Sequence, residues 1–405
     1  MKALLLTGGQ ASRLHPFTIT RPKPMLPIAN RPILERNLLQ LGEAGVTSVV
    51  IVTDEGVGGE QIRSHLGDGS ALGLSVEYIH KTAGSIGAAV VAARGKFVPG
   101  QYFMLVYADV LTTDNIFSGS LSVFNRLRAP IAGVCLTGES TSLYGNVYLD
   151  GEMRITRIVE KPKEPGLGNY VLGGVFMMPY DLFELLEESG EKILAALEKL
   201  IERYGVYAAI WEKEWIDINY PWSILEANRM VMDTWSDSRI ARDVDVADGV
   251  RIHGPVAIEG GVRIREGAVI RGPVIIGRDS FIGNNALIRE YTALGPGSVV
   301  GFSTELKNCI IFAGASIGRI SYIGDSVVGE RAKIGSCTMT INVRVGGGSI
   351  WVPVRGELQD SGLAKLGAFI GDGANIGASN TIQAGAVIDG GAVIGDHFTV
   401  DRGGG

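Results

Sequence analysis

The fold of the first half of the chain is decided by its opening stretch, residues 2–33, which reads KALLLTGGQASRLHPFTITRPKPMLPIANRPI. The apolar run at residues 4–6 is short and continuous, like the buried strands of parallel sheets. Gly8 and Gly9 come directly after this run. A small-residue loop at the carboxyl end of such a strand can turn backbone N–H groups toward a phosphate. On its own, the loop fits an ordinary strand-to-helix turn equally well.

Basic residues and prolines set this loop apart from an ordinary turn. Arg13 and Lys23 add fixed positive charge where a triphosphate would lie. Prolines stiffen the segment and keep it from forming one long helix, at Pro16, Pro22, Pro24 and Pro27. The stretch as a whole therefore predicts a phosphate-binding loop.

Helical and strand patterns alternate after the opening stretch. We expect helices at residues 33–44, 61–66 and 86–94, and strands at residues 49–53, 74–79 and 102–107. This alternation predicts an α/β fold with a mostly parallel, doubly wound sheet, and ligands at the carboxyl ends of its strands.

An acidic residue, Asp109, closes the strand pattern FMLVYAD. A carboxylate just after a central strand is well placed to hold a divalent cation beside a nucleotide. Asp109 could also cap the helix that follows, which is a common role for aspartate. We favour the metal ligand.

The combination GGQASRL, HPFT and RPKPMLPI resembles the signature of the sugar-1-phosphate nucleotidyltransferases. Residues 159–162, VEKP, are similar to the E-K-P of that family's sugar-phosphate pocket. Residues 214–230, EWIDINYPWSILEANRM, resemble its W-x-D-I-x-x-P-W-x-x-L-x-A-N stretch. The resemblance implies a Rossmann-like, doubly wound mixed sheet of the nucleotide-diphospho-sugar transferase type over residues 1–235.

The resemblance also implies a role for each site residue. Arg13 and Lys23 would be catalytic, and Asp109 and Asp217 would hold Mg²⁺. The nucleotide would be bound by Leu6, Thr7, Gly8, Gly9 and Gly87. The sugar phosphate would be bound by Tyr144, Gly145, Glu160, Lys161 and Gly174.

Several positions depart from the family pattern, in which the loop usually reads G-x-G-T-R-L. Ala11 stands at a glycine position, where a Cβ restricts positive φ and the approach of the backbone to a phosphate. Ser85 and Ile86 also depart, at the start of a segment that the family places near the base and ribose.

From about residue 240 an aliphatic or aromatic residue recurs at every sixth position. The series is Ile252, Ile258, Ile264, Ile270, Ile276, Ile282, Ile288, Leu294, Val300, Leu306 and Phe312, and it resumes at Ile370, Ile376, Ile382, Ile388, Ile394 and Val400. A six-residue unit with one inward aliphatic predicts a left-handed parallel β-helix. We therefore expect a second domain over residues 236–405, with a loop inserted near 346–366, that assembles as a homotrimer or a multiple of trimers.

Together the two halves resemble the archaeal-type bifunctional sugar-1-phosphate nucleotidyltransferase/acetyltransferases. Tyr322, Asn342 and Lys365 match family positions in the acetyltransferase segments, so a pocket for acetyl-CoA or an amino sugar is implied there. The family's histidine base is replaced by Arg319, which stays protonated and cannot accept a proton. We therefore expect acetylation to be weak or absent.

The composition excludes several other classes of protein. The 405 residues are 46% hydrophobic and 20% charged, which is ordinary for a globular chain. A net charge of −6 argues against a nucleic-acid surface. Three cysteines without metal-ligand spacing indicate reduced thiols in the cytoplasm. No apolar run approaches the roughly 20 residues that span a bilayer.

The activity that these features predict joins a nucleoside triphosphate to a sugar-1-phosphate and releases pyrophosphate. UTP, dTTP and GTP remain open as donors, and the 1-phosphates of glucose, N-acetylglucosamine and mannose as acceptors. The alternative is a regulatory subunit that binds sugar nucleotides and assembles with an active paralogue. The loop departures favour that alternative, whereas the intact Arg13, Lys23, Asp109 and Asp217 oppose it.

Overall fold

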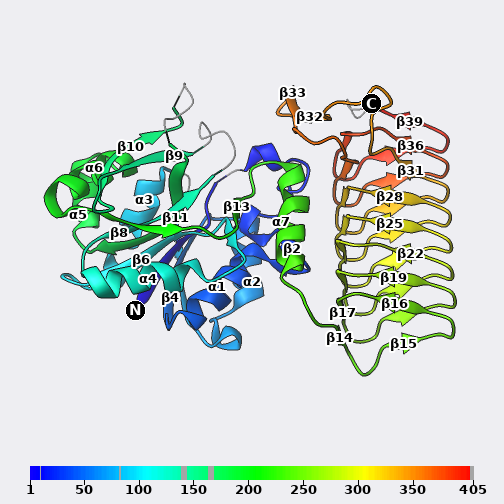
Figure 1. The fold of residues 1–405 in the computed structure, drawn as a ribbon, viewed down its shortest axis with the longest axis horizontal. Coiled ribbons are helices and arrows are strands. Elements are labelled where there is room, and N and C mark those ends of the chain that lie inside the picture. The colour runs from blue at the N-terminus through cyan, green and yellow to red at the C-terminus, as the bar shows by residue number, and fades with distance from the viewer. Residues whose placement is uncertain (10, 82–83, 138–143, 163–167, 402–405) are drawn as a thin grey trace. The chain divides into compact units, whose positions relative to one another are not determined.

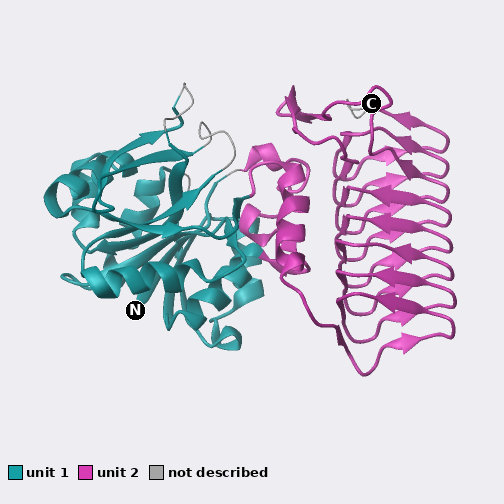
Figure 2. Ribbon diagram, viewed as in Figure 1, with its two compact units in different colours: residues 1–9, 33–217 teal, residues 10–32, 218–405 magenta. Residues whose placement is uncertain are grey.

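The structure is a computed structural model that describes residues 1–9, 11–81, 84–137, 144–162 and 168–401. It divides into two compact units (Figure 2). The first contains Met1–Gly9 and Ile33–Asp217, and the second contains Gln10–Pro32 and Ile218–Gly405. Residues 10–32 and 218–235 thus belong by their contacts to the second unit, whereas the boundary expected from the sequence assigns them to the first domain.

The first unit is built on one mixed sheet, with nine strands in its described residues (Figure 1). The central strand β1 (Lys2–Leu6) lies parallel to β4 (Ser48–Thr53) and β6 (Tyr102–Tyr107), and β5 (Ser75–His80) extends the parallel part beyond β4. The remaining strands are β8 (Ile131–Leu136), β9 (Gly145–Leu149), β10 (Ile155–Glu160), β11 (Tyr170–Pro179) and β12 (Tyr207–Trp211). Antiparallel β11 joins β6 to β8 and β9, which confirms the mixed sheet.

Helices pack against this sheet because each presents one apolar stripe to it. They are α1 (Ile33–Glu43), α2 (Val57–Leu66), α3 (Ile86–Ala92), α4 (Ile116–Leu127), α5 (Leu182–Glu188) and α6 (Ile193–Tyr204). Val90 of α3, Phe183 of α5 and Leu197 of α6 share one buried cluster with Leu4 and Phe103 of the sheet. None of the helices in the described ranges is both long and apolar enough to cross a membrane.

The second unit contains a β-helix of three parallel sheets (Figure 1). The first sheet comprises β14 (Arg239–Ile240), β17 (Val256–Ile258), β20 (Val274–Ile276), β23 (Thr292–Leu294), β26 (Ile310–Ile311), β29 (Val327–Val328), β34 (Phe369–Ile370) and β37 (Val387–Ile388). The second comprises β15 (Asp245–Val246), β18 (Arg263–Ile264), β21 (Phe281–Ile282), β24 (Val299–Val300), β27 (Ser316–Ile317), β30 (Lys333–Ile334), β35 (Asn375–Ile376) and β38 (Val393–Ile394). The third comprises β16 (Arg251–His253), β19 (Val269–Arg271), β22 (Leu287–Ile288), β25 (Glu305–Lys307), β28 (Tyr322–Gly324), β31 (Met339–Thr340), β36 (Thr381–Ile382) and β39 (Thr399–Val400).

The coils confirm the six-residue repeat. Ile258 pairs with Ile276, and Ile276 with Leu294, so that one coil takes 18 residues, or three hexads. The inward aliphatic residues form a continuous buried core from Ile258 to Val400. This architecture is the expected left-handed hexapeptide type of β-helix.

Phe312 corrects the predicted series of inward residues. The partner of Leu294 in the next coil is Ile311, not Phe312, because the turn after Leu306 is one residue shorter than in earlier coils. Ile311 belongs to the interior cluster and Phe312 does not. The prediction was therefore wrong at Phe312, whose ring is nevertheless buried, 5.6 Å from the ring of Phe17.

The insertion expected near residues 346–366 interrupts the β-helix without breaking its sheets. Val328 pairs with Ile370 across it, and Thr340 pairs with Ile382. Its residues form an antiparallel hairpin of β32 (Trp351–Val354) and β33 (Glu357–Asp360).

Candidate active site

The glycine loop follows β1 at the carboxyl edge of the parallel strands. Thr7 fixes its start, because its backbone N and its Oγ1 both donate to the Val52 carbonyl, at 3.2 and 2.8 Å. Gly8 and Gly9 then lie exposed, and Gly9 has a φ of +131°, which residues with a Cβ rarely adopt. The backbone after β1 is therefore open for a close approach by a ligand.

The two predicted metal ligands come together through one short antiparallel pair. Asp109 lies between β6 and β7 (Val110–Thr112), and Asp217 ends β13 (Trp215–Asp217). The register places Asp217 opposite Val110, one residue from Asp109. The Ala108 N–H donates to the Leu6 carbonyl at 3.1 Å, which ties this corner to the end of β1.

This pair of carboxylates fits Mg²⁺ that arrives with a nucleotide. Magnesium in phosphoryl-transfer sites is usually held by one or two carboxylates, substrate phosphates and water. Across the described ranges, no cluster of three or more His, Cys, Asp or Glu side chains could hold a metal ion. A cation at Asp109 and Asp217 would thus complete its coordination with phosphate oxygens and water.

The residues predicted for the sugar phosphate are also neighbours. Gly145 lies opposite Glu160 in the pairing of β9 with β10, and the Lys161 N–H donates to the Tyr144 carbonyl at 2.9 Å. A Cβ on Gly145 would lie 3.0 Å from Glu160 Oε2. The Lys161 Nζ lies 3.5 Å from Glu160 Oε1, and both side chains are exposed, so solvent weakens their mutual attraction.

Gly174 of β11 lies beside the strand residues next to Asp109. Its φ is +71°, and a Cβ there would lie 2.9 Å from Cγ2 of Val110 and 3.2 Å from Cβ of Tyr107. Burial, with the negative charges of Glu160 and Asp109, raises the pKa of the Tyr107 hydroxyl well above its usual value. Tyr107 therefore stays a protonated, uncharged residue between the predicted metal ligands and the residues predicted to bind the sugar phosphate.

Sequence reasoning missed two aromatic residues of this region, Tyr107 and Trp215. The Trp215 ring lies 5.4 Å from the ring of Tyr144 in an edge-on arrangement, and its Nε1 donates to the Leu136 carbonyl at 2.8 Å. The signal for Trp215 was its place two residues before Asp217; Tyr107 has the corresponding place before Asp109.

Gly87 has an evident packing role at the start of α3. A Cβ there would lie 2.1 Å from the Glu191 carbonyl oxygen. Ser85 caps the helix by accepting from the Ala88 N–H at 3.1 Å, and its hydroxyl donates to the same Glu191 carbonyl at 3.0 Å. The departure to serine thus leaves a well-capped helix, and nucleotide binding by Gly87 stays a prediction.

Arg13 and Lys23 lie in the second unit, on two short 3₁₀ turns, Ser12–Leu14 and Lys23–Met25. Arg13 Nη2 donates to Asn219 Oδ1 at 2.6 Å, and its guanidinium lies 5.3 Å from the centre of the Tyr220 ring. These contacts fix the position of the Arg13 side chain. The Lys23 side chain is buried.

Ala11 adopts the backbone conformation that its Cβ disfavours. Its φ and ψ are 41° and 37°, in the left-handed region. Its carbonyl accepts hydrogen bonds from the Leu14 N–H at 2.9 Å and the Thr18 hydroxyl at 3.0 Å. The departure from glycine therefore places an alanine in a strained backbone conformation that these hydrogen bonds hold.

In the β-helix, Tyr322 and Asn342 meet around a buried carboxylate. The Asn342 amide donates to the Tyr322 hydroxyl at 3.0 Å and to Asp325 Oδ2 at 2.6 Å. Burial, with the charges of Asp325 and Glu305, raises the pKa of Tyr322. Lys365 is exposed just before Leu366, whose N–H donates to the Asn342 carbonyl, and Arg319 is exposed as well.

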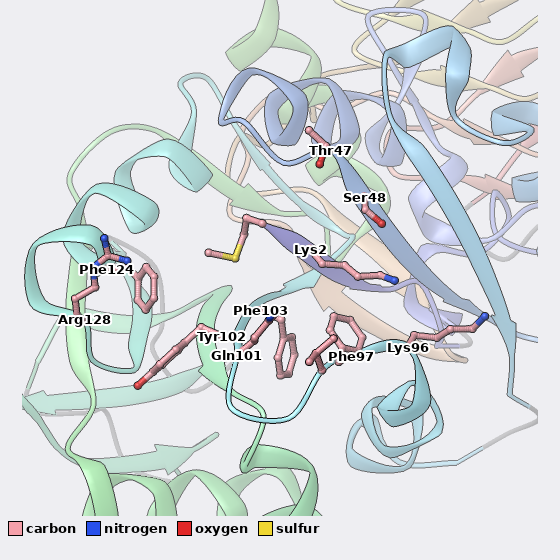
Figure 3. A pocket seen from close by; sticks show the side chains of 12 residues that line it. Lys2, Thr47, Ser48, Lys96, Phe97, Gln101, Tyr102, Phe103, Phe124 and Arg128 are labelled. Atoms are coloured by element: carbon pink, nitrogen blue, oxygen red, sulfur yellow. The ribbon is translucent and has the colours of Figure 1, made fainter.

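A cavity of about 540 Å³ in the first unit lies away from all of these residues (Figure 3). Its lining includes Lys2, Ser48 and Tyr102, which begin β1, β4 and β6. It therefore opens at the amino ends of the parallel strands, opposite the edge that carries the glycine loop.

A glycine loop after β1, two aspartates brought near one another by the pairing of β7 with β13, and a hexapeptide β-helix are the features of a nucleotide-binding transferase with a solenoid domain. A family model described as nucleotidyl transferase matches residues 2–234, and one described as the GMPPB C-terminal domain matches residues 270–355. The chain belongs to the nucleotidyl transferase family and is a nucleotidyltransferase.

Curated relatives match along nearly the whole chain. The bifunctional sugar-1-phosphate nucleotidylyltransferase/acetyltransferase of Sulfurisphaera tokodaii is 31% identical, over 94% of this chain and 92% of that protein. The bifunctional protein GlmU of Methanococcus maripaludis is 33% identical, over 99% and 95%. Among solved structures, a Bacillus anthracis protein assigned as a glucose-1-phosphate thymidylyltransferase matches 57% of this chain and 94% of its own, with a TM-score of 0.53 and 23% identity, which supports the fold.

Substitutions of Ala11 test the strain in the loop. We expect Ala11→Gly to keep or raise the turnover, since glycine adopts this φ freely. Ala11→Val should lower both turnover and thermal stability, because a β-branched residue at positive φ is a marked outlier. Steady-state kinetics and thermal unfolding of the purified variants provide the comparison. Faster turnover in the valine variant than in the glycine variant would contradict this account.

Proposed function

We propose that this protein transfers a nucleoside monophosphate from a nucleoside triphosphate to a sugar-1-phosphate and releases pyrophosphate. The observation that carries this proposal is the arrangement of the first unit. There the glycine loop, the Asp109–Asp217 pair and the Gly145–Glu160 pair are linked through Leu6, Val110, Tyr107 and Gly174.

The reaction needs no protein nucleophile or base. A phosphate oxygen of the sugar-1-phosphate is already anionic and attacks the α-phosphorus, while the bond from that phosphorus to the bridging oxygen breaks and pyrophosphate leaves. The barrier is charge repulsion and misorientation, which fixed cations and backbone donors relieve. When bound, Mg²⁺ neutralises phosphate charge and acts as a Lewis acid.

Each site residue has a task in this proposal. Backbone N–H groups of residues 7–9 bind the triphosphate, and Arg13 and Lys23 stabilise the phosphate charge during transfer. Glu160 accepts hydrogen bonds from sugar hydroxyls, and Lys161 binds the sugar phosphate. Asp109 and Asp217 hold the cation.

The substrates are identified by pyrophosphate release with Mg²⁺, across UTP, dTTP and GTP and the 1-phosphates of glucose, N-acetylglucosamine and mannose. One strong combination would establish the activity and name both substrates. A folded protein that binds sugar nucleotides but releases no pyrophosphate would favour the regulatory subunit instead.

We expect Asp217→Asn to lower kcat by roughly two orders of magnitude, the scale on which the loss of one electrostatic stabiliser acts. Asp248→Asn, which changes an exposed aspartate of the β-helix in the same way, should leave kcat unchanged. Pyrophosphate release at saturating Mg²⁺ measures both. An Asp217→Asn variant with wild-type kcat would remove this residue from the metal site.

A second activity, acetyl-CoA-dependent acetylation, has partial support in the Tyr322–Asn342 contact. Arg319 stands where the base is expected and cannot accept a proton. We therefore expect acetylation of glucosamine-1-phosphate to be weak or absent in an assay of CoA thiol release. A normal rate would refute this expectation.

We also propose a cytoplasmic homotrimer or multiple of trimers. Exposed apolar side chains on the β-helix support self-association, among them Val299, Phe302, Ile320, Met339 and Phe398. Light scattering of the full chain should give the mass of three chains or a multiple of three. A monomer at micromolar concentration would exclude this assembly.

A further inference from the structure

The segment that carries Arg13 and Lys23 belongs to the same compact unit as the β-helix (Figure 2). Phe17 is fully buried, with its ring 5.6 Å from that of Phe312 and 6.4 Å from that of Phe369. Phe312 and Phe369 are next in sequence to the inward residues Ile311 and Ile370. The two phenylalanines do not belong to the interior cluster of the β-helix. Phe17 therefore covers two rings that face out from the coils.

A buried cation lies beside this aromatic cluster. The Arg21 guanidinium lies 4.9 Å from the centre of the Phe312 ring. Its Nη2 donates to Asp372 Oδ2 at 2.5 Å and to Glu330 Oε2 at 3.1 Å. The side chains of Arg21 and Asp372 are only 11% and 8% exposed. In such a setting the removal of one charge leaves its partner buried and uncompensated, so the contact strongly favours a single arrangement.

The carboxylate that Arg21 meets is itself fixed by the coils. Asp372 Oδ1 accepts from the Glu330 N–H at 2.6 Å, which joins the corner after β29 to the corner after β34. The Thr20 hydroxyl donates to the other carboxylate oxygen. Arg21 thus binds a rigid acceptor and not a mobile surface carboxylate.

The segment makes further polar contacts with the coils and with the inserted hairpin. Ser12 accepts from Arg355 Nε at 2.8 Å, and His15 lies 2.6 Å from Asp389, both at exposed positions. Asn30 donates to the Leu294 carbonyl at 2.6 Å. The two exposed pairs contribute little individually, and the Asn30 contact is a single hydrogen bond between neutral groups. Phe17 and Arg21 are therefore the main anchor of the segment.

The backbone that carries Arg13 and Lys23 depends on such an anchor, in addition to the contacts of the Arg13 side chain with Asn219 and Tyr220. Arg13 and Lys23 each belong to a 3₁₀ turn of three residues, and turns of this length do not fix their own orientation. Arg21 is separated from Lys23 by Pro22 alone, and Phe17 lies between the two turns. The β-helix contact is therefore well placed to set the position of both cations.

We propose that Arg21 is a positioning residue for nucleotidyl transfer, which holds Arg13 and Lys23 in place through its contact with Asp372, Glu330 and Phe312. This proposal rests on the proposed function, since that function gives Arg13 and Lys23 their roles on the triphosphate. It makes the β-helix a part of the nucleotide-binding machinery in addition to any role in assembly.

The kinetic signature separates positioning from stability. Arg21→Ala should lower kcat/KM for the nucleoside triphosphate by roughly 10- to 100-fold, the scale on which small misplacements act. The KM for the sugar-1-phosphate should stay the same, because Gly145 and Glu160 lie in the first unit. The kcat/KM of Arg21→Lys should lie between those of the wild type and Arg21→Ala, since lysine keeps the charge but not the planar guanidinium.

The matched control is Arg278→Ala, which removes an arginine of the β-helix that is 72% exposed and lies 3.9 Å from Glu259. It should leave all constants unchanged. Asp372→Ala should reproduce the effect of Arg21→Ala, and the double variant should be little worse than either single one, because both changes break one contact.

Two measurements do not depend on turnover. Hydrogen exchange of the full chain should show faster exchange over residues 12–30 in Arg21→Ala than in Arg278→Ala. Titration calorimetry with UTP, dTTP and GTP in Mg²⁺ should show weaker binding of the preferred nucleotide in Arg21→Ala. If wild-type protein releases no pyrophosphate but shows both effects, the proposed function fails while the anchor stands.

Three results would overturn the proposal. One is unchanged exchange over residues 12–30 in Arg21→Ala. Another is an Arg21→Ala variant whose activity falls only in proportion to its folded fraction, while its KM and Kd for the nucleotide equal those of the wild type. The third is a wild-type protein that binds no nucleoside triphosphate.

Discussion

The pairing of β7 with β13 is the constraint on which the candidate site depends. These strands are three residues each, yet they join parts of the chain more than a hundred residues apart and place Asp217 one residue from Asp109. Carboxylates that lie close together repel one another, and a cation offsets this repulsion. The fold stabilises the arrangement with contacts that do not involve the carboxylates, such as the Tyr144–Trp215 ring contact and the hydrogen bond from Ala108 to Leu6. The position of the two aspartates is therefore set by backbone pairing and by contacts of their neighbours.

Positive backbone dihedrals are a second common theme of the site. Gly9, Gly174 and Ala11 all have φ above zero: Gly9 and Ala11 lie in the loop after β1, and Gly174 lies in β11 where its pairing with β8 shifts register. Two of the three are glycines, which adopt this conformation without strain. Ala11 shows that the loop geometry is imposed by its neighbours, since the hydrogen bonds from Leu14 and Thr18 hold the carbonyl of a residue that is not suited to it.

The sequence predicted most of the fold because its signals are local and periodic. The hexad series gave the coils of the β-helix, and the opening stretch gave β1 with its loop. Phe312 was misassigned because residues 310–312 are all apolar, so a turn shortened by one residue leaves no mark in the pattern. Tyr107 and Trp215 were missed because their part depends on a pairing between distant strands. The grouping of residues 10–32 with the β-helix was likewise hidden, because Phe17 and Arg21 lie inside a motif that indicates phosphate binding and gives no sign of their partners Phe312 and Asp372.

The hairpin of β32 and β33 has a consequence for how such a chain can change over time. Val328 pairs with Ile370 although 41 residues intervene, and all three sheets continue across the insertion. Each strand of a solenoid finds its partners in the coils above and below, so a corner is closed by its neighbours whatever length of chain leaves and returns there. The entropy of closing a loop also grows only slowly with its length. The corners of this β-helix are therefore places where evolution can add new surface, and with it new specificity, at little cost to the fold.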